Sequence, residues 1–243
     1  MRKFDLHIHT TCSQDWIWGP DAVSTPKQVV ETAIRKGLDG IAVTDHETVK
    51  GGLLASKIAR RIDRDFLVIP GIEVRCRDGD LLGLGLETDP KRRMSRLSAV
   101  EAAEELREMG ALVVAPHPFG WGGIGDRVER AKLDAIEGFN ASQLRCINLR
   151  ARVAAHKLRL PVVAGSDAHY HVNVGNAVTG IECESDTVDS VLTAIRKGKT
   201  SIIGEKRTNN RMVVYLLRIG MLLKTILGEP PICVEIREAS EQV

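Results

Sequence analysis

Short apolar runs rich in β-forming residues alternate with longer helix-like runs from residue 4 to about residue 204. The predicted strands are 4–9, 40–44, 66–70, 112–115, 135–138, 162–165 and 180–183. Helices are predicted to begin near Thr25, Val49, Ser98, Asp126, Ser142 and Asp186. The segment 74–86, with Asp78-Gly79 at its centre, is typical of a hairpin. The alternation favours a parallel barrel or a closely related α/β sheet.

The composition excludes several classes of protein. A length of 243 residues with 43% apolar residues fits one large domain with an appendage, predicted here as 1–204 and 205–243. The 34 basic against 32 acidic residues argue against a protein that coats nucleic acid, and 4% aromatic residues disfavour repeated base-stacking platforms. Five cysteines without a C-x-x-C pair, and an N-terminus without an apolar leader, predict a cytoplasmic protein with free thiols.

The C-terminal segment differs from the rest of the chain. Residues 206–224 include five basic residues and no acidic one, and the apolar stretch 212–227 contains Arg218 and Lys224. This stretch is too short and too charged for a transmembrane span. We expect an amphipathic helix that packs on the barrel or joins two copies as a homo-oligomer. Contact with a membrane surface or an acidic partner is the alternative.

Histidines and carboxylates gather at the ends of the predicted strands. His7 and His9 alternate on the first strand, so both point to one face. The other residues of this kind follow later strands and are His46, Glu73, His117, Asp167 and His169. Barrel enzymes place their active sites where the C-terminal strand ends meet. Imidazole and carboxylate groups converging there predict a site for Zn²⁺, Mn²⁺ or Fe²⁺, whereas His156, in mid-helix, is predicted to be an ordinary residue.

This ordered set resembles the polymerase and histidinol phosphatase (PHP) family. The matching text is Asp5-Leu6-His7-Ile8-His9-Thr10, Gly37 to His46, Pro70-Gly71-Ile72-Glu73, His117-Pro118-Phe119 and Gly165-Ser166-Asp167-Ala168-His169. The resemblance covers about residues 3–204. It implies a distorted (β/α)7 TIM-like barrel with two or three divalent metal ions (Zn, Mn, Fe or Mg) at its C-terminal mouth. It also implies that the protein hydrolyses phosphoesters there. By the same resemblance His7, His9, Glu73 and Asp167 serve one metal, Glu73 bridges, and His46, His117 and His169 complete the cluster.

The sequence departs from the family pattern at two positions. Family members usually carry an acidic or histidine ligand a few residues after His-x-His, and here Asp15 is the predicted ligand, one residue late. The strand after Glu73 often begins with a ligand histidine, whereas here Asp80 precedes Leu81-Leu82-Gly83. Asp80 is predicted either to replace that ligand with an oxygen donor, which favours Mn²⁺ or Mg²⁺, or to act as an acceptor in the turn.

The predicted chemistry follows from the metals. Neighbouring cations lower the pKa of a bridging water, and the hydroxide becomes the nucleophile. The proton for the leaving group is predicted to come through Asp167 or a neighbouring histidine such as His169. Arg75, two residues beyond Glu73, and Arg145 are the candidate phosphate-binding cations. The expected substrate is a small phosphomonoester, a nucleotide or the end of a short oligonucleotide.

Two other functions stay open at this level. A metal-dependent amidohydrolase would use similar ligands, but it usually needs a lysine or cysteine at the bridge, and no lysine lies at a predicted strand end. A non-catalytic barrel, serving as a scaffold or a ribonucleoprotein subunit, would have to keep an idle buried cluster of histidines and carboxylates. The loop 120–127, which begins Gly120-Trp121-Gly122-Gly123, is either a mobile flap over the mouth or a glycine-rich turn.

Overall fold

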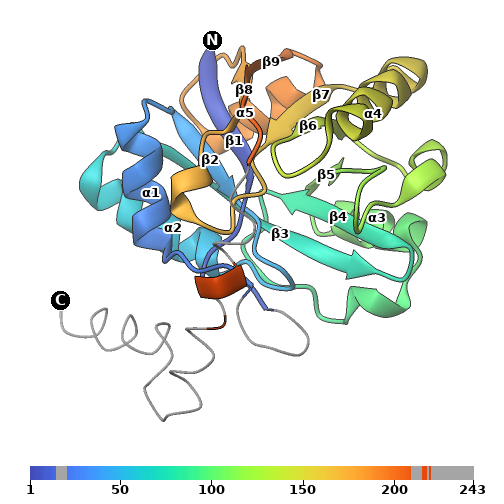
Figure 1. The fold of residues 1–243 in the computed structure, drawn as a ribbon, viewed down its shortest axis with the longest axis horizontal. Coiled ribbons are helices and arrows are strands. Elements are labelled where there is room, and N and C mark those ends of the chain that lie inside the picture. The colour runs from blue at the N-terminus through green and yellow to red at the C-terminus, as the bar shows by residue number, and fades with distance from the viewer. Residues whose placement is uncertain (15–20, 209–214, 218, 220–243) are drawn as a thin grey trace.

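The computed structural model describes residues 1–14, 21–208, 215–217 and 219 (Figure 1). The strands are β1 (Arg2–Ile8), β2 (Gly40–Val43), β3 (Leu67–Cys76), β4 (Gly79–Leu84), β5 (Leu112–Ala115), β6 (Ala135–Asn140), β7 (Val162–Gly165), β8 (Ala177–Ile181) and β9 (Thr200–Glu205). The α-helices are α1 (Pro26–Arg35), α2 (Lys50–Ile62), α3 (Ala99–Glu108), α4 (Arg145–Leu158) and α5 (Val188–Arg196). Short 3₁₀ turns are η1 (Met94–Arg96), η2 (Gly125–Glu129) and η3 (His171–Asn173).

Within the described residues, the nine strands form one mixed sheet in the order β7-β6-β5-β4-β3-β2-β1-β8-β9. The pairs β1/β2, β2/β3, β5/β6 and β6/β7 are parallel, and the pairs involving β4 or β8 are antiparallel. Helices α1 and α2 lie on one side of the strands, with α3 and α4 on the other (Figure 1). The expected α/β barrel architecture is confirmed, with antiparallel strands inserted into the parallel order.

The sheet curls until its ends nearly meet. The backbone just after β7 pairs with β1, where Asp167 N donates to His7 O at 2.8 Å and His9 N donates to Ala168 O at 3.0 Å. Within β7 itself, Ala164 O accepts from the Thr179 hydroxyl of β8, and Ala164 N donates to that hydroxyl. These contacts bring the histidines of β1 beside the segment that follows β7.

The interior of the barrel is apolar at the end opposite the histidines. Its buried side chains come from β1 to β8, and Leu192 and Ile195 of α5 pack among them. Helix α5 therefore closes that end, and the apolar contacts stabilise the strands that carry the site.

A bulge in β1 sets the direction of its histidines. Phe4 and Leu6 belong to the interior core, but Ile8 packs with the residues of α1 on the outside. The register with β2 shifts between Asp5 and Ile8. Such a shift changes which face the following side chains occupy, and bulges often lie beside active sites for this reason. After the bulge, it is the histidines that point inward.

The third strand is longer than the sequence predicts. The predicted strand ends at Pro70, yet β3 continues to Cys76 because its second half pairs antiparallel with β4 in the predicted hairpin. Glu73 thus lies on a strand, not after one. The helix starts agree within three residues except near Asp126, where the chain forms only the short 3₁₀ turn η2, and Thr25 and Ser98 form capping boxes with Gln28 and Glu101.

Most of the predicted C-terminal helix lies outside the described residues, so the division into 1–204 and 205–243 stays a prediction. Among the helices that the structure describes, none combines the length and the apolar character needed to cross a bilayer.

Candidate metal centre

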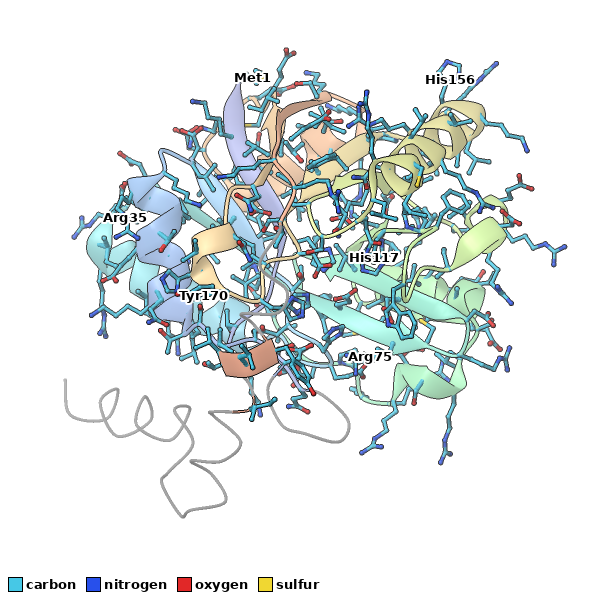
Figure 2. All side chains as sticks on the ribbon, viewed as in Figure 1. Met1, Arg35, Arg75, His117, His156 and Tyr170 are labelled. Atoms are coloured by element: carbon cyan, nitrogen blue, oxygen red, sulfur yellow. The ribbon has the colours of Figure 1, made fainter. Side chains whose placement is uncertain are left out.

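The predicted ligand side chains meet at one end of the barrel. They are carried by β1, by β3 and by the segments that follow β1, β2, β5 and β7, and the structure brings together His7, His9, His46, Glu73, His117, Asp167 and His169. His156 lies exposed on α4, far from this cluster, whereas His117 lies near the middle of the molecule (Figure 2). The structure thus brings these side chains to one end of the barrel, although Glu73 lies within β3 and not after a strand.

Glu73 lies at the centre of the cluster. Its Oε2 atom is 3.2 Å from Nε2 of His7, 3.1 Å from Nε2 of His9 and 3.5 Å from Nε2 of His46. Its Oε1 atom is 3.2 Å from Nε2 of His117. The Nε2 atoms of His7 and His9 are themselves 3.1 Å apart. One carboxylate therefore faces four imidazoles, as a bridging ligand would.

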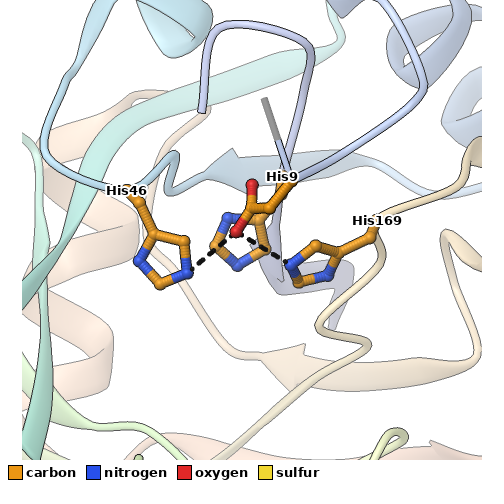
Figure 3. A group of neighbouring side chains, drawn as sticks. His9, His46 and His169 are labelled. Carbon is orange, nitrogen blue, oxygen red and sulfur yellow. Dashed lines mark ion pairs between the residues drawn. The ribbon is translucent and has the colours of Figure 1, made fainter. Parts of the chain in front are cut away.

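Asp21, which the sequence analysis did not select, joins the other side of the cluster. Its Oδ2 atom is 3.2 Å from Nε2 of His46 and 3.4 Å from Nε2 of His169. Figure 3 shows His46 and His169 pointing toward this carboxylate, with His9 close by. Asp15, the predicted acid of this loop, lies outside the described residues. The family's acidic position after His-x-His was the available signal for a carboxylate from this loop, and a ligand role for Asp15 stays a prediction.

A buried network behind the cluster orients its ligands. Oε1 of Glu137, on β6, lies 3.1 Å from Nδ1 of His7, and Oε2 accepts from His117 N and from Asn140 Nδ2. Partners of this kind fix the tautomer and direct the other ring nitrogen to a metal. Gly165 allows the close packing, because a Cβ atom there would overlap both His7 and Glu137. A carboxylate inside an apolar strand was the available signal for Glu137.

The electrostatics of the metal-free cluster are strongly perturbed. Burial lowers the pKa of His9, but hydrogen bonds with Asp167 and Glu73 outweigh it and raise that pKa to about 10. The pKa of His117 rises to about 9, where Glu73 again overcomes burial. For His46 burial dominates and the pKa falls to about 4, so that imidazole is neutral. The cluster thus holds protons that a cation would displace.

The carboxylates are held as anions. Burial alone would raise the pKa of Asp167, but the charge of His7 and a hydrogen bond from His9 hold it well below its usual range. For Asp21, the charge and hydrogen bond of His169 outweigh burial in the same direction. Asp167 also lies 3.4 Å from Nε2 of His9 and 3.5 Å from Nδ1 of His169. It links the two sides of the cluster.

The backbone is strained at two of these residues. Among the described non-glycine residues, four have a positive φ, and two of them are His117 at 29° and Asp167 at 52°. Such conformations cost of order 1–3 kcal/mol and collect at functional sites. At both positions the backbone is bent into a form that presents the side chain to the cluster.

The donor set fits divalent metal ions. The ligand side chains form three groups, and within each group the ligand atoms all lie within 4.8 Å of one another. The groups are His9-Asp21-His46-His169, His7-Glu73-His117 and His7-His9-Asp167. Ligands about 2.0–2.2 Å from a tetrahedral ion lie roughly 3.3–3.6 Å apart, close to the 3.1–3.7 Å separations between His7, His9, Glu73 and Asp167. In addition, Asp21 Oδ1, His46 Nδ1 and His117 Nδ1 are buried without a hydrogen-bond partner among the described residues.

A cavity of about 640 Å³ opens over the cluster. Its walls include Arg75 and Asp80, and one Arg75 nitrogen lies 3.8 Å from Oδ2 of Asp21. Asp80 lies outside the three ligand groups, and burial together with the charge of Glu73 raises its pKa to about 7. Arg145, in contrast, is the exposed first residue of α4 and does not line the cavity, because β6 ends five residues earlier.

The sequence of this chain is similar to sequences of known proteins. The sequence matches the PHP domain over residues 5–119 and the PHP-associated region over residues 147–200. An uncharacterised protein of Methanocaldococcus jannaschii is 37% identical over 146 residues, which are 57% of this chain and 82% of that protein. A 5′-3′ exoribonuclease of Haemophilus influenzae is 30% identical over 146 residues, or 58% of this chain and 45% of that enzyme.

A solved structure shares the fold. A two-domain protein of Bacteroides vulgatus, containing a predicted PHP-like metal-dependent phosphoesterase, superposes with a TM-score of 0.69. The superposition covers 90% of this chain and 69% of that one, at 18% sequence identity. At this identity the likeness is one of fold.

Proposed function

This chain belongs to the PHP family of metal-dependent phosphoesterases, and from that premise we propose that it hydrolyses the terminal phosphoester of a nucleotide or a short oligonucleotide. The observation that carries the proposal is the buried cluster of histidines and carboxylates at the base of an open cavity of about 640 Å³. That volume suits a ligand of nucleotide size, and the cluster lies where the phosphate would be held.

Divalent ions, when bound, lower the pKa of coordinated water and neutralise phosphoryl oxygens as charge develops. In the proposal His7, His9, Glu73 and Asp167 hold one ion. Asp21, His46, His117 and His169 complete the set, with Glu73 shared between ions. Two or three ions are proposed, drawn from Zn, Mn, Fe and Mg, because His7 and His9 each belong to two of the three groups of ligand atoms.

Two residues at the cavity have proposed roles toward the substrate. The guanidinium of Arg75 lies on the wall of the cavity beside the cluster, where it binds a nonbridging phosphate oxygen. His169 is one-quarter exposed, unlike the other cluster histidines, so it can exchange a proton with the leaving group. Asp167 is less suited to that step, because its pKa lies well below the usual range and the carboxylate stays ionised.

Amidohydrolase chemistry is the weaker candidate. Among the described residues that line the cavity there is no lysine, and the one cysteine is Cys76. Burial and the charge of Asp80 raise the pKa of this thiol well above its usual range, so Cys76 stays protonated and is a poor bridging ligand.

The proposal is tested with purified protein. Bound metal is measured by mass spectrometry, and turnover is measured with Mn²⁺ or Zn²⁺ on p-nitrophenyl phosphate, a bis-ester, nucleoside monophosphates and 5′-labelled oligoribonucleotides. We expect cleavage at an oligonucleotide end and the loss of both metal and activity in His9→Ala. The matched control is His156→Ala, which removes an exposed histidine on α4 and should change neither. Retention of full activity by His9→Ala would contradict the proposal.

A further inference from the structure

We propose that the cavity adjoining the metal centre binds the nucleobase next to the reacting phosphate, with Trp121 as its stacking surface. This inference rests on the proposed function and specifies its substrate. The adjoining cavity has a volume of about 350 Å³ and shares Trp121, Ser142, Gln143 and Thr208 with the cavity over the cluster. A ligand whose phosphate lies at the cluster can therefore extend directly into it.

Trp121 is the strongest sign of a ligand. Its side chain is 91% exposed, more than any other large apolar residue described. An indole left in water forgoes the stabilisation that its burial would provide, and exposed aromatic residues beside a catalytic site commonly contact a ligand. Because Trp121 lines both cavities, its ring is available to a group entering from the metal centre.

The loop that carries Trp121 is an ordered turn. Gly120 N donates to His117 O, Gly123 N donates to Gly120 O, and Gly125 N donates to Pro118 O. Asp80 N of β4 donates to Gly122 O at 2.7 Å, which fixes the turn to the sheet. These bonds form the glycine-rich turn that the sequence analysis gave as one of its two predictions. Trp121 is thereby held in a set position relative to His117, a member of the cluster four residues earlier.

The remaining walls suit a base. Phe119, Leu144 and Ile147 give apolar surface, and Leu144 is 55% exposed. The carboxamide of Gln143 lies against Gly120, where any Cβ atom would overlap it, and it offers both a donor and an acceptor to a base edge. Apolar walls with one amide favour a flat heteroaromatic ring over a sugar or an acidic group.

A cation lies at the outer rim. Arg207 lines the adjoining cavity and is exposed, and the backbone on both sides of it is held by bonds from Lys206 N to Asn176 O and from Thr208 N to Ala141 O. An arginine beyond the base is placed to meet the next phosphate of a chain. The scarcity of aromatic residues fits a single stacked base and not a long stacked strand.

The test compares ligands with and without a base. Binding of adenosine 5′-monophosphate, adenosine 3′-monophosphate and ribose 5-phosphate to the Mn²⁺-loaded protein is measured by titration calorimetry. We expect at least one of the two nucleotides to bind about tenfold more tightly than ribose 5-phosphate, the order of magnitude expected for one stacked base. Trp121→Ala should abolish this preference and Trp121→Phe should keep most of it.

Leu149→Ala is the matched control, since Leu149 is an exposed apolar residue of α4 that lines neither cavity. It should leave the preference unchanged. Equal binding of all three ligands to the unsubstituted protein, or a preference that survives Trp121→Ala, would overturn the inference. Because binding is measured apart from turnover, an absence of phosphoester hydrolysis would count against the proposed function and not against this cavity.

Discussion

Oδ2 of Asp21 lies 3.2 Å from Nε2 of His46, although the two residues belong to different segments of the chain. His46 comes after β2, whereas Asp21 comes between β1 and α1. The second oxygen of Asp21 is buried without a hydrogen-bond partner among the described residues. This carboxylate has an oxygen lone pair available for a cation and lies beside a neutral imidazole, and both are properties of a metal ligand.

Asp21→Asn is therefore expected to lower metal affinity by at least about tenfold and to reduce turnover in parallel. The amide keeps the size of the side chain but loses its charge, so the fold should persist. Asp15→Asn serves as the comparison, because Asp15 was the acid predicted from the sequence. Metal titration followed by calorimetry measures both variants. A larger loss in Asp15→Asn would show that the carboxylate from residue 15 supplies the ligand.

Arg75→Gln is expected to lower kcat/KM by about 10- to 100-fold without changing the bound metal. Charge-assisted hydrogen bonds contribute about 1.5–3 kcal/mol each, and Arg75 lies on the cavity wall beside the cluster. Arg145→Gln removes an exposed arginine outside that cavity and should have no effect. Steady-state kinetics on the preferred substrate decide the matter, and equal losses in both variants would refute a specific role for Arg75.

The metal-free protein should lose stability as the pH rises from about 7 to 10. The folded-state pKa values of His9 and His117, about 10 and about 9, lie above the ordinary 6.5. Their protonated forms stabilise the fold fully below pH 6.5, and this stabilisation is lost as the pH rises through the raised values. Scanning calorimetry in the presence of a chelator should show that Tm falls as the pH rises. This fall should be smaller in His9→Gln and unchanged in His156→Gln.

Added metal should act in the opposite sense. Imidazoles bind a cation in their neutral form, so the increase of Tm caused by Mn²⁺ should grow over the same pH range. An increase that shrinks toward pH 10, before hydroxide precipitates the metal, would contradict the placement of these histidines as ligands.

Asp80→Asn is expected to stabilise the metal-free protein at pH 8. Burial and the charge of Glu73 raise the pKa of Asp80 to about 7, so its ionised form is unfavourable above that pH and the neutral amide removes the penalty. The expected result is a higher denaturant concentration at the midpoint of chemical unfolding. Metal content measured on the same variant decides the open question at this position, since the loss of an ion would identify Asp80 as a ligand.

The elements that carry the site could be predicted where a local sequence pattern marks them. Buried apolar runs mark β2, β5 and β7 closely, and the capping residues mark α1 and α3. The hairpin was recognised from Asp78-Gly79, but its reach was not, because β3 is extended by pairing with β4 and not by a change in its own composition. Pairing across strands is a non-local interaction that local patterns do not record.

The chemistry proposed for the centre could be predicted from residue types, because the order of His7, His9, His46, Glu73, His117, Asp167 and His169 along the chain favours a metal site. Which carboxylates join them depends on the fold. Asp21 reaches His46 and His169 through the path of a loop, and Glu137 reaches His7 across the barrel. The direction of His7 itself depends on a bulge in β1. Residue types fix which bonds can form, but packing fixes which atoms come within reach of one another.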